Sequence, residues 1–563
     1  MPRAPLPPTI SGDKRQGSGL VKPGNYDLAG IRDRMKSRLE DMKEVHRRHE
    51  MDADRAVDDI VESQTKIDQM GEDIPNLSRK YKFYQELRGY MTDLTDCYDE
   101  KMITIGYLES RIDKVYSEQR GKIRERRRQD VGDQSEVLSA MTASNLAAMV
   151  DPVQDAVRDY RAAEREGRRM RRRQGRENRG ETGHNDGMSS DDELPTQDAN
   201  SLAKVREDVE IQSRLAMEDV VEEFSVLANV MDRLQSWRQN DEDSYKSAYV
   251  SLCLPKIFSP LIRLEMLFWS PLEDASPMSK CDWFSTLATY AILNEAKYQE
   301  WELDPDRNLI SSCSEKIILP RLLTIVKSSY DPMSTSQTTN LVTFLTKLVS
   351  DCPTISMRSK QLRELLSSVV DNIKDYLDND VYIPMYTKHQ MESPGNQHAQ
   401  FFNRQFWTVF KLYKNVLSWA VINITFLLKH TLKSVSSSQG ILSDGILSEL
   451  VLDKLLNRYL LMSLRANQNN NDSVFKSKQV CINRIITFLI IIDFIIFKIV
   501  DVLPKWWLES GSAEMPKLSM FTRFMSGLGC CQGLSREAII ETARIVRILG
   551  DYETGEKLRE LLY

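Results

Sequence analysis

The sequence contains few of the residues that interrupt long structural elements. Its 563 residues include only 24 glycines and 20 prolines, together about 8% of the chain. These two types usually contribute roughly 12% of a globular chain. Stretches that alternate apolar and polar residues, as strands do, are almost absent, and the one candidate is 381–386. A chain short of turn residues spends its length in long elements, so the composition favours helices.

Cysteine is scarce as well. The eight cysteines include no pair with CxxC spacing, which argues against a disulfide framework and a zinc ribbon and favours reduced thiols in the cytosol or nucleus. Residues 1–19 lack the apolar core of a secretory signal, so we expect none. The formal charge of −6 by itself indicates neither a nucleic-acid nor a membrane partner.

One run is apolar enough to suggest a membrane span. It extends from Ile485 to Leu503 but contains Asp493, Lys498 and Asp501. Each of these charges costs about 2.5–3.5 kcal/mol at the centre of a bilayer. We therefore expect a buried helix of a globular domain here, and no membrane association.

No local motif indicates catalysis. The sequence has neither a GxxxxGK[ST] phosphate loop nor a GxGxxG turn between a strand and a helix. His46 and His49 are three residues apart on a predicted helix, but Arg47 and Arg48 lie between them and would repel a cation. We predict a non-enzymatic protein with no catalytic, cofactor-binding or metal site and no small-molecule substrate.

A heptad pattern of apolar residues runs through 31–129 and predicts coiled-coil helices. Twelve seam positions between Met35 and Ile74 hold nine apolar residues, counting alanine. A second seam, from Leu77 to Val115, has a single polar member. The second seam supplies our candidate docking residues for a partner, which are Tyr84, Leu87, Met91, Leu94 and Leu108.

Pro75 separates the two seams and is expected to end or kink the helix. Two long helices joined near a proline can fold back on each other as a helical hairpin, or each can pair with another chain. The pattern does not distinguish these alternatives, and the architecture that we predict takes the hairpin.

Basic residues concentrate in two places. Nine arginines and three glutamates occupy 161–179 without any aromatic residue, and a shorter basic stretch precedes it at 120–128. Such a composition forms no core, so we predict a disordered linker, with a short helix near 137–150. The candidate residues for nuclear import or for phosphate contact are Arg126, Arg127, Arg128, Arg168, Arg169, Arg171, Arg172 and Arg173.

Two serines are candidate phosphorylation sites. Ser189 and Ser190 precede the acidic run 191–193, and a phosphate on either would add about −1.5 to −2 charges next to the arginine-rich stretch. An unmodified spacer is the equally ranked alternative. An aromatic and proline-rich run between Trp237 and Trp283 is interpreted first as core packing and second as a groove for a partner peptide.

Together these features predict an all-α protein. We expect a disordered N-terminus rich in proline and glycine at 1–30, a long coiled-coil helical hairpin at 31–129, an arginine-rich and then acidic disordered linker at 130–199, and an irregular helical domain at 200–563. The last segment is large enough for a sizeable core.

Several stretches resemble the GC-rich sequence DNA-binding factor family. The similarity covers roughly residue 31 to the C-terminus. It is carried by LEDMKEVHRRHE at 39–50, YKFYQELRGYMTDLTDCYD at 81–99, Trp237-Arg238, LCLPK at 252–256, VYIPMY at 381–386, RQFW at 404–407, LLNRYLLM at 455–462 and Pro504-Lys505-Trp506.

The resemblance implies a nuclear scaffold subunit of the late spliceosome. Family members look like proteins that act beside a G-patch protein and a DEAH-box helicase, which releases the excised intron lariat. These two are the implied partners, and the arginine-rich tract would contact RNA or DNA phosphates. The alternative is a DNA-binding transcription factor, or an adaptor linking a DNA-bound factor to histone methylation. No helix-turn-helix, zinc-finger or basic-zipper signature is visible, which favours splicing.

Overall fold

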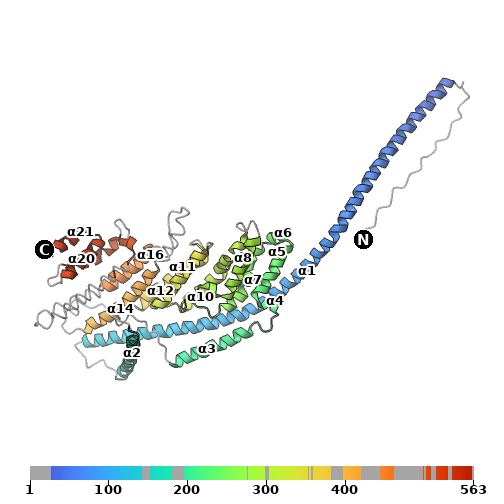
Figure 1. Ribbon diagram of the computed structural model, residues 1–563. Coiled ribbons are helices and arrows are strands. Elements are labelled where there is room, and N and C mark those ends of the chain that lie inside the picture. The colour runs from blue at the N-terminus through green and yellow to red at the C-terminus, as the bar shows by residue number, and fades with distance from the viewer. Residues whose placement is uncertain are drawn as a thin grey trace, which may run out of the picture. The chain divides into compact units, whose positions relative to one another are not determined.

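The all-α class is confirmed. The computed structural model describes residues 27–142, 152–180, 196–274, 277–297, 304–352, 354–356, 359–381, 397–419, 444–461, 499, 503–508, 515–529 and 536–560. Every regular element in these ranges is a helix (Figure 1). The chain divides into two compact units, residues 1–93 and residues 94–563.

Helix α1 is one continuous element, so the predicted hairpin is not formed. It runs over Leu28–Thr142, 115 residues, and passes through Pro75 without a break. A proline inside a helix removes one hydrogen bond, and its ring clashes with the carbonyl four residues earlier. That carbonyl belongs to Gly71, which has no Cβ to restrict a small backbone adjustment. The helix can therefore continue through the proline.

The second unit contains the C-terminal part of α1 and the remaining helices. Its longer helices are α2 (Pro152–Asn178), α3 (Thr196–Leu215), α5 (Leu227–Asn240), α7 (Val250–Glu265), α8 (Asp282–Lys297), α10 (Leu319–Ser329), α11 (Thr335–Asp351), α12 (Lys360–Asn379), α14 (Gln397–Ser418), α19 (Ser519–Gly529), α20 (Arg536–Ile548) and α21 (Tyr552–Glu560).

Short helices connect these elements. They are α4 (Glu222–Ser225), α6 (Glu242–Ser247), η1 (Met278–Lys280), η3 (Pro305–Asn308), α9 (Leu309–Cys313), the π-helical η4 (Ser314–Ile318), α16 (Asp444–Ser448), the π-helical η5 (Glu449–Leu460), η6 (Lys505–Leu508) and η7 (Met515–Leu518).

Much of the predicted linker is helical. Helix α1 extends to Thr142, α2 covers most of the arginine-rich stretch, and α3 begins at Thr196. The composition of α2 is too polar to form a core of its own. It is nevertheless rich in arginine, glutamate and alanine, which are good helix formers. Its arginines find acidic partners on α1, and such partners are not visible from local composition.

Much of the aromatic and proline-rich run packs in the core, which agrees with the first of its two interpretations, although Tyr249 is exposed. Tyr245, Phe258 and Trp283 are all buried. Pro255 and Pro260 lie inside α7 and are buried with them. Further along the chain, α10 packs against α12, and α14 packs against α11 and η5.

The apolar run at 485–503 falls almost entirely outside the described residues. Of its members, Ile499 and Leu503 are described, and both are buried. The hydroxyl of Tyr413 donates a hydrogen bond to the carbonyl of Ile499 at 3.1 Å. Among the helices that the structure describes, none combines the length and apolar composition that crossing a bilayer requires.

Candidate functional site

The C-terminal part of α1 runs along the other helices of the domain (Figure 1), and ion pairs join it to them. Towards α3, Arg111 pairs with Asp208 at 2.6 Å and Lys122 pairs with Asp198 at 2.6 Å. Towards other helices, Arg263 of α7 donates to Glu109 at 3.0 Å, and Arg321 of α10 pairs with Asp113 at 2.7 Å. This part of α1 is therefore an integral member of the helical domain.

The predicted basic cluster Arg126–Arg128 lies in this part of α1. Two of its arginines form ion pairs with other residues of the chain. Arg127 pairs with Asp331 at 2.7 Å, and Arg128 pairs with the buried Asp380, which also accepts from Arg124. These contacts hold α1 against the ends of α10 and α12. Import or phosphate contact through Arg127 and Arg128 remains a prediction, and it would have to compete with these ion pairs.

Arg124 forms a further ion pair between α1 and α12. Its guanidinium lies 2.7 Å from Asp375 of α12, and this hydrogen bond to Arg124 lowers the pKa of the Asp375 carboxyl. A lowered pKa means that the folded protein favours the ionised carboxylate. The pair therefore stabilises the domain above the ordinary pKa of aspartate, and its contribution disappears as the pH falls through the lowered value.

Helix α2 carries the arginine-rich tract and presents one edge to α1. Arg161 pairs with Asp133 at 2.6 Å, and Arg165 lies 3.0 Å from Asp130. Arg168 lies 3.7 Å from the same Asp130, and its side chain is only 4% exposed. The spacing of these arginines, three or four residues apart, places them on one helix face. Arg168 is thus a contact between helices within the domain.

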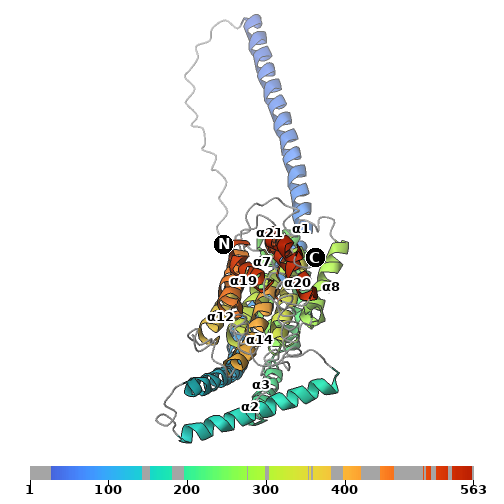
Figure 2. The same ribbon diagram turned by 90° about the vertical axis from the view of Figure 1, so that its left-hand side faces the viewer.

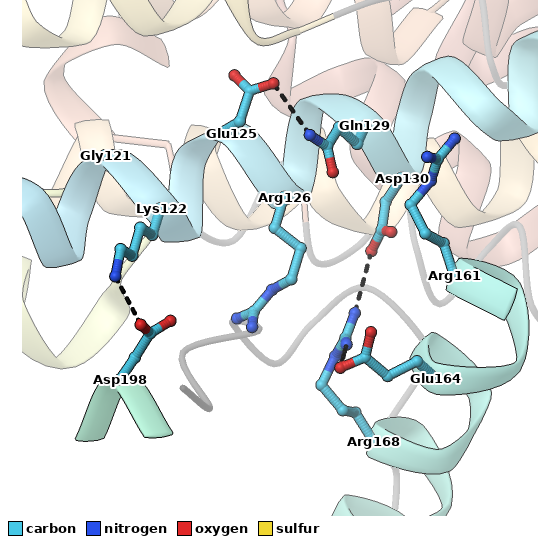
Figure 3. Close-up of a pocket in the computed structure, with 10 residues that line it drawn as sticks. All are labelled: Gly121, Lys122, Glu125, Arg126, Gln129, Asp130, Arg161, Glu164, Arg168 and Asp198. Atoms are coloured by element: carbon cyan, nitrogen blue, oxygen red, sulfur yellow. Dashed lines mark hydrogen bonds and ion pairs between the residues drawn. The ribbon is translucent and has the colours of Figure 1, made fainter. Parts of the chain in front are cut away.

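A groove of about 400 Å³ opens between α1, α2 and the start of α3 (Figure 3). Its basic side chains are Lys122, Arg126, Arg161 and Arg168, and its acidic side chains are Glu125, Asp130, Glu164 and Asp198. In Figure 3 the side chain of Arg126 points from α1 into the space between the other two helices. Four positive and four negative groups give the groove no net charge, so its composition does not favour a phosphate.

The C-terminal half of α2 is different. Arg171 and Arg173 are exposed, and Arg172 is half-buried. Arg169 is partly buried and lies 3.7 Å from Glu166 on the preceding turn. Figure 2 shows α2 along its length. The arginines of α2 therefore differ in their exposure: Arg168 is buried against α1, whereas Arg171 and Arg173 are exposed.

The two candidate phosphorylation sites, Ser189 and Ser190, lie outside the described residues. Within the described ranges no three histidine, cysteine, aspartate or glutamate side chains gather in an arrangement that could hold a metal ion. His46 is exposed and lies 3.4 Å from Glu50 of its own helix.

Part of the predicted docking seam is unavailable to a partner. Leu94 and Leu108 are fully buried. Leu108 packs with Ile112, with Val209 of α3 and with Leu267 after α7. Leu87 is also buried, and Tyr84 and Met91 are half-buried. The apolar periodicity of the second seam is real, but at Leu108 it reflects burial within the helical domain.

The exposed apolar surface lies instead on the earlier part of α1, in the first unit. Seven apolar members of the seam are between 52% and 70% exposed, and they are Met35, Leu39, Met42, Ile60, Ile67, Met70 and Ile74. We call this set, with the other five seam positions (His46, His49, Ala53, Ala56 and Ser63), the N-terminal seam. The heptad spacing predicts this seam, although the predicted docking residues all belong to the second one.

A buried polar network was missed by sequence reasoning. Arg238 of α5 is 1% exposed and donates to the fully buried Asp306 at 2.7 Å and also to Asp304. Tyr245 and Tyr290 each donate a hydroxyl hydrogen bond to Asp306 at 3.0 Å. Burial, and then the Asp306 charge, raises the pKa of both tyrosines, so they stay protonated donors.

A signal for this network exists in the sequence. Met231 and Leu234 lie on the buried face of α5, and Arg238 follows at the next helical spacing. An arginine that continues an apolar stripe is a candidate for burial, and a buried guanidinium needs a negatively charged partner such as a carboxylate. In the sequence, Asp304-Pro305 looks like a simple break between helices. Asp304 nevertheless supplies part of the negative charge that pairs with Arg238.

The fold and these surfaces define the class of protein: an all-α chain in which a long helix is built into a helical domain by ion pairs and carries an uncovered apolar seam in its N-terminal part. A family model described as GC-rich sequence DNA-binding factor-like protein matches residues 227–463. This match confirms the resemblance predicted from the sequence.

The chain is similar to known proteins over nearly its whole length. Human PAX3- and PAX7-binding protein 1 is 32% identical over 560 residues, which cover 94% of this chain and 56% of the relative. Mouse Intron Large complex component GCFC2 is 30% identical over 551 residues, covering 96% of this chain and 65% of the relative. The chain therefore spans between about half and two thirds of the length of these two animal relatives.

A plant protein shows a more limited similarity. Transcriptional repressor ILP1 of Arabidopsis thaliana is 26% identical over 254 residues, covering 45% of this chain and 25% of the relative. The names of the three relatives describe roles in splicing or in transcription, and both processes belong to the nucleus.

Proposed function

We propose that this protein is a nuclear, non-enzymatic scaffold subunit of the late spliceosome. The observation that carries the proposal is the similarity, over 96% of this chain, to a protein named as an Intron Large complex component. The partners that we propose are a G-patch protein and a DEAH-box helicase that acts on the intron-lariat complex.

The architecture supports a scaffold role. The charged side chains of the C-terminal part of α1 are used to fasten helices together, as the pairs Arg127–Asp331 and Arg321–Asp113 illustrate. The buried Arg238–Asp306 network likewise connects α5 to η3. A domain whose helices are fastened together in this way keeps its surfaces in fixed positions, which suits it to holding other macromolecules in place.

RNA contact is proposed for the exposed half of α2. Changing Arg171, Arg172 and Arg173 to glutamine is expected to flatten the salt dependence of RNA binding. The slope of log K against log salt should fall by about 0.7 for each phosphate that the protein no longer neutralises. The measurement is fluorescence anisotropy with a single-stranded RNA over a series of salt concentrations.

The matched control changes Arg47, Arg48 and Arg55 to glutamine. These three arginines are also highly exposed, but they lie on the first unit. We expect the control to keep the slope of the unmodified protein. An equal decrease of slope in both variants would show that only total charge matters and would remove α2 as the specific contact.

Transcription is the second candidate function. It is favoured by two relatives whose names describe a PAX3- and PAX7-binding protein and a transcriptional repressor. In this case the protein is an adaptor between a DNA-bound factor and histone methylation machinery. The α2 arginines would then contact DNA in a sequence-independent way, because phosphate contacts carry no sequence information directly.

The experiment that separates these functions is affinity purification of the tagged chain from nuclear extract at moderate salt, followed by identification of the bound proteins and RNAs. Excised introns, late spliceosomal small nuclear RNAs and a DEAH-box helicase would support the splicing role. Recovery of chromatin and methyltransferase subunits without small nuclear RNA would replace it with the transcription role.

A further inference from the structure

The N-terminal seam is a long apolar surface that the first unit leaves uncovered. Between Met35 and Ile74 it extends about 60 Å along the helix, at 1.5 Å per residue. Its seven large apolar members are exposed. A heptad seam of this length normally packs against another helix by knobs-into-holes contacts. The composition of the seam indicates which helix covers it.

The order of residues along the seam makes it complementary to itself when two copies run antiparallel. Large residues occupy both ends, and small or polar residues occupy the middle. If the two-fold axis passes between Ala53 and Ala56, every member of the seam meets another member. The facing pairs are Met35 with Ile74, Leu39 with Met70, Met42 with Ile67, His46 with Ser63, His49 with Ile60, and Ala53 with Ala56.

These pairs are chemically matched. The three outer pairs are large and apolar on both sides, His46 meets another polar side chain, and the two alanines let the helices approach closely at the axis. His49 against Ile60 is the one mixed pair. Because a two-fold interface repeats each pair twice, all twelve positions of each copy are covered.

The distribution of charge along the helix favours antiparallel over parallel pairing of the two copies. Residues 31–48 carry seven basic and four acidic side chains, whereas residues 61–78 carry one basic and four acidic side chains. An antiparallel pair places the positive segment of one copy beside the negative segment of the other, at both ends. A parallel pair places like beside like, and brings Arg38 near Lys43 of the other copy. The acidic middle, 49–60, faces itself in either orientation and does not distinguish them.

We infer that two copies of this chain associate through the N-terminal seam as an antiparallel two-helix coiled coil centred between Ala53 and Ala56. This self-association does not depend on whether the protein acts in splicing or in transcription.

Cysteine crosslinking tests the orientation. Full-length Leu39→Cys and full-length Met70→Cys are mixed and oxidised, and the linked peptides are identified by mass spectrometry so that native cysteines are told apart. Antiparallel pairing predicts a peptide joining position 39 of one copy to position 70 of the other. Links of 39 to 39 and of 70 to 70 would overturn the antiparallel arrangement.

Sedimentation of the full chain at micromolar concentration tests whether the chain dimerises through the N-terminal seam. We expect a dimer, and we expect only monomer in the double variant Ile60→Asp with Ile67→Asp. The control is Met51→Asp with Val61→Asp, because both residues are exposed on the same helix but lie off the seam. An unmodified chain that sediments as a monomer would overturn the proposal, as would a dimer that survives the seam variant. Unchanged urea unfolding of the helical domain in both variants confirms that they are folded.

Discussion

Replacing Arg238 by alanine is expected to destabilise the helical domain by about 3–5 kcal/mol, the usual cost of removing one member of a buried ion pair. Asp306 is fully buried and receives its charged hydrogen bond from Arg238 at 2.7 Å. Without the guanidinium, the two neutral tyrosine hydroxyls are the remaining donors to that oxygen. The variant would therefore leave a buried carboxylate without its counter-charge.

The change in free energy of unfolding is measured by urea titration followed by tryptophan fluorescence. The control is Arg214→Ala, which removes an arginine that is 75% exposed and pairs with Glu210 one turn away at 2.6 Å. Such exposed pairs contribute about 0.3–0.5 kcal/mol. If both variants unfolded at the same urea concentration, the buried network would have no special role in stability.

Replacing Leu108 by aspartate is expected to have a similarly large effect, roughly 4 kcal/mol or more, because it removes apolar packing and buries a charge. Leu108 packs with Val209 and Leu267, so the substitution separates α1 from α3 and from the segment after α7. The outcome is a destabilised domain, whereas a docking residue would leave the domain folded and weaken only the binding of a partner.

Ile103→Asp is the matched control on the same helix. Ile103 is 76% exposed, and we expect its change to alter the free energy of unfolding by less than about 0.5 kcal/mol. Urea unfolding and circular dichroism of the two variants give the comparison. A Leu108→Asp protein as stable as the Ile103→Asp protein would mean that α1 and α3 are not packed together in solution.

The two sets of arginines show why some site residues were predictable and others were not. The tract on α2 and the cluster at Arg126–Arg128 stand out in the sequence by composition alone. Their partners do not: Arg128 reaches Asp380, 252 residues away in the chain, and Arg161 reaches Asp133, 28 residues away. A charged side chain looks the same in sequence whether it faces water or a carboxylate, so its availability is decided by packing.

Local patterns determined the helical class, the heptad spacing of α1 and the family resemblance, because helix propensity and apolar periodicity act within a few turns of the chain. The tertiary structure decided the rest. It fastened the C-terminal part of α1 into the helical domain by ion pairs and buried Leu108 there. It made α2 a helix held by Asp130 and Asp133, and it enclosed Arg238 with Asp306. These outcomes depend on contacts between distant segments, whose free energies arise only when the segments meet.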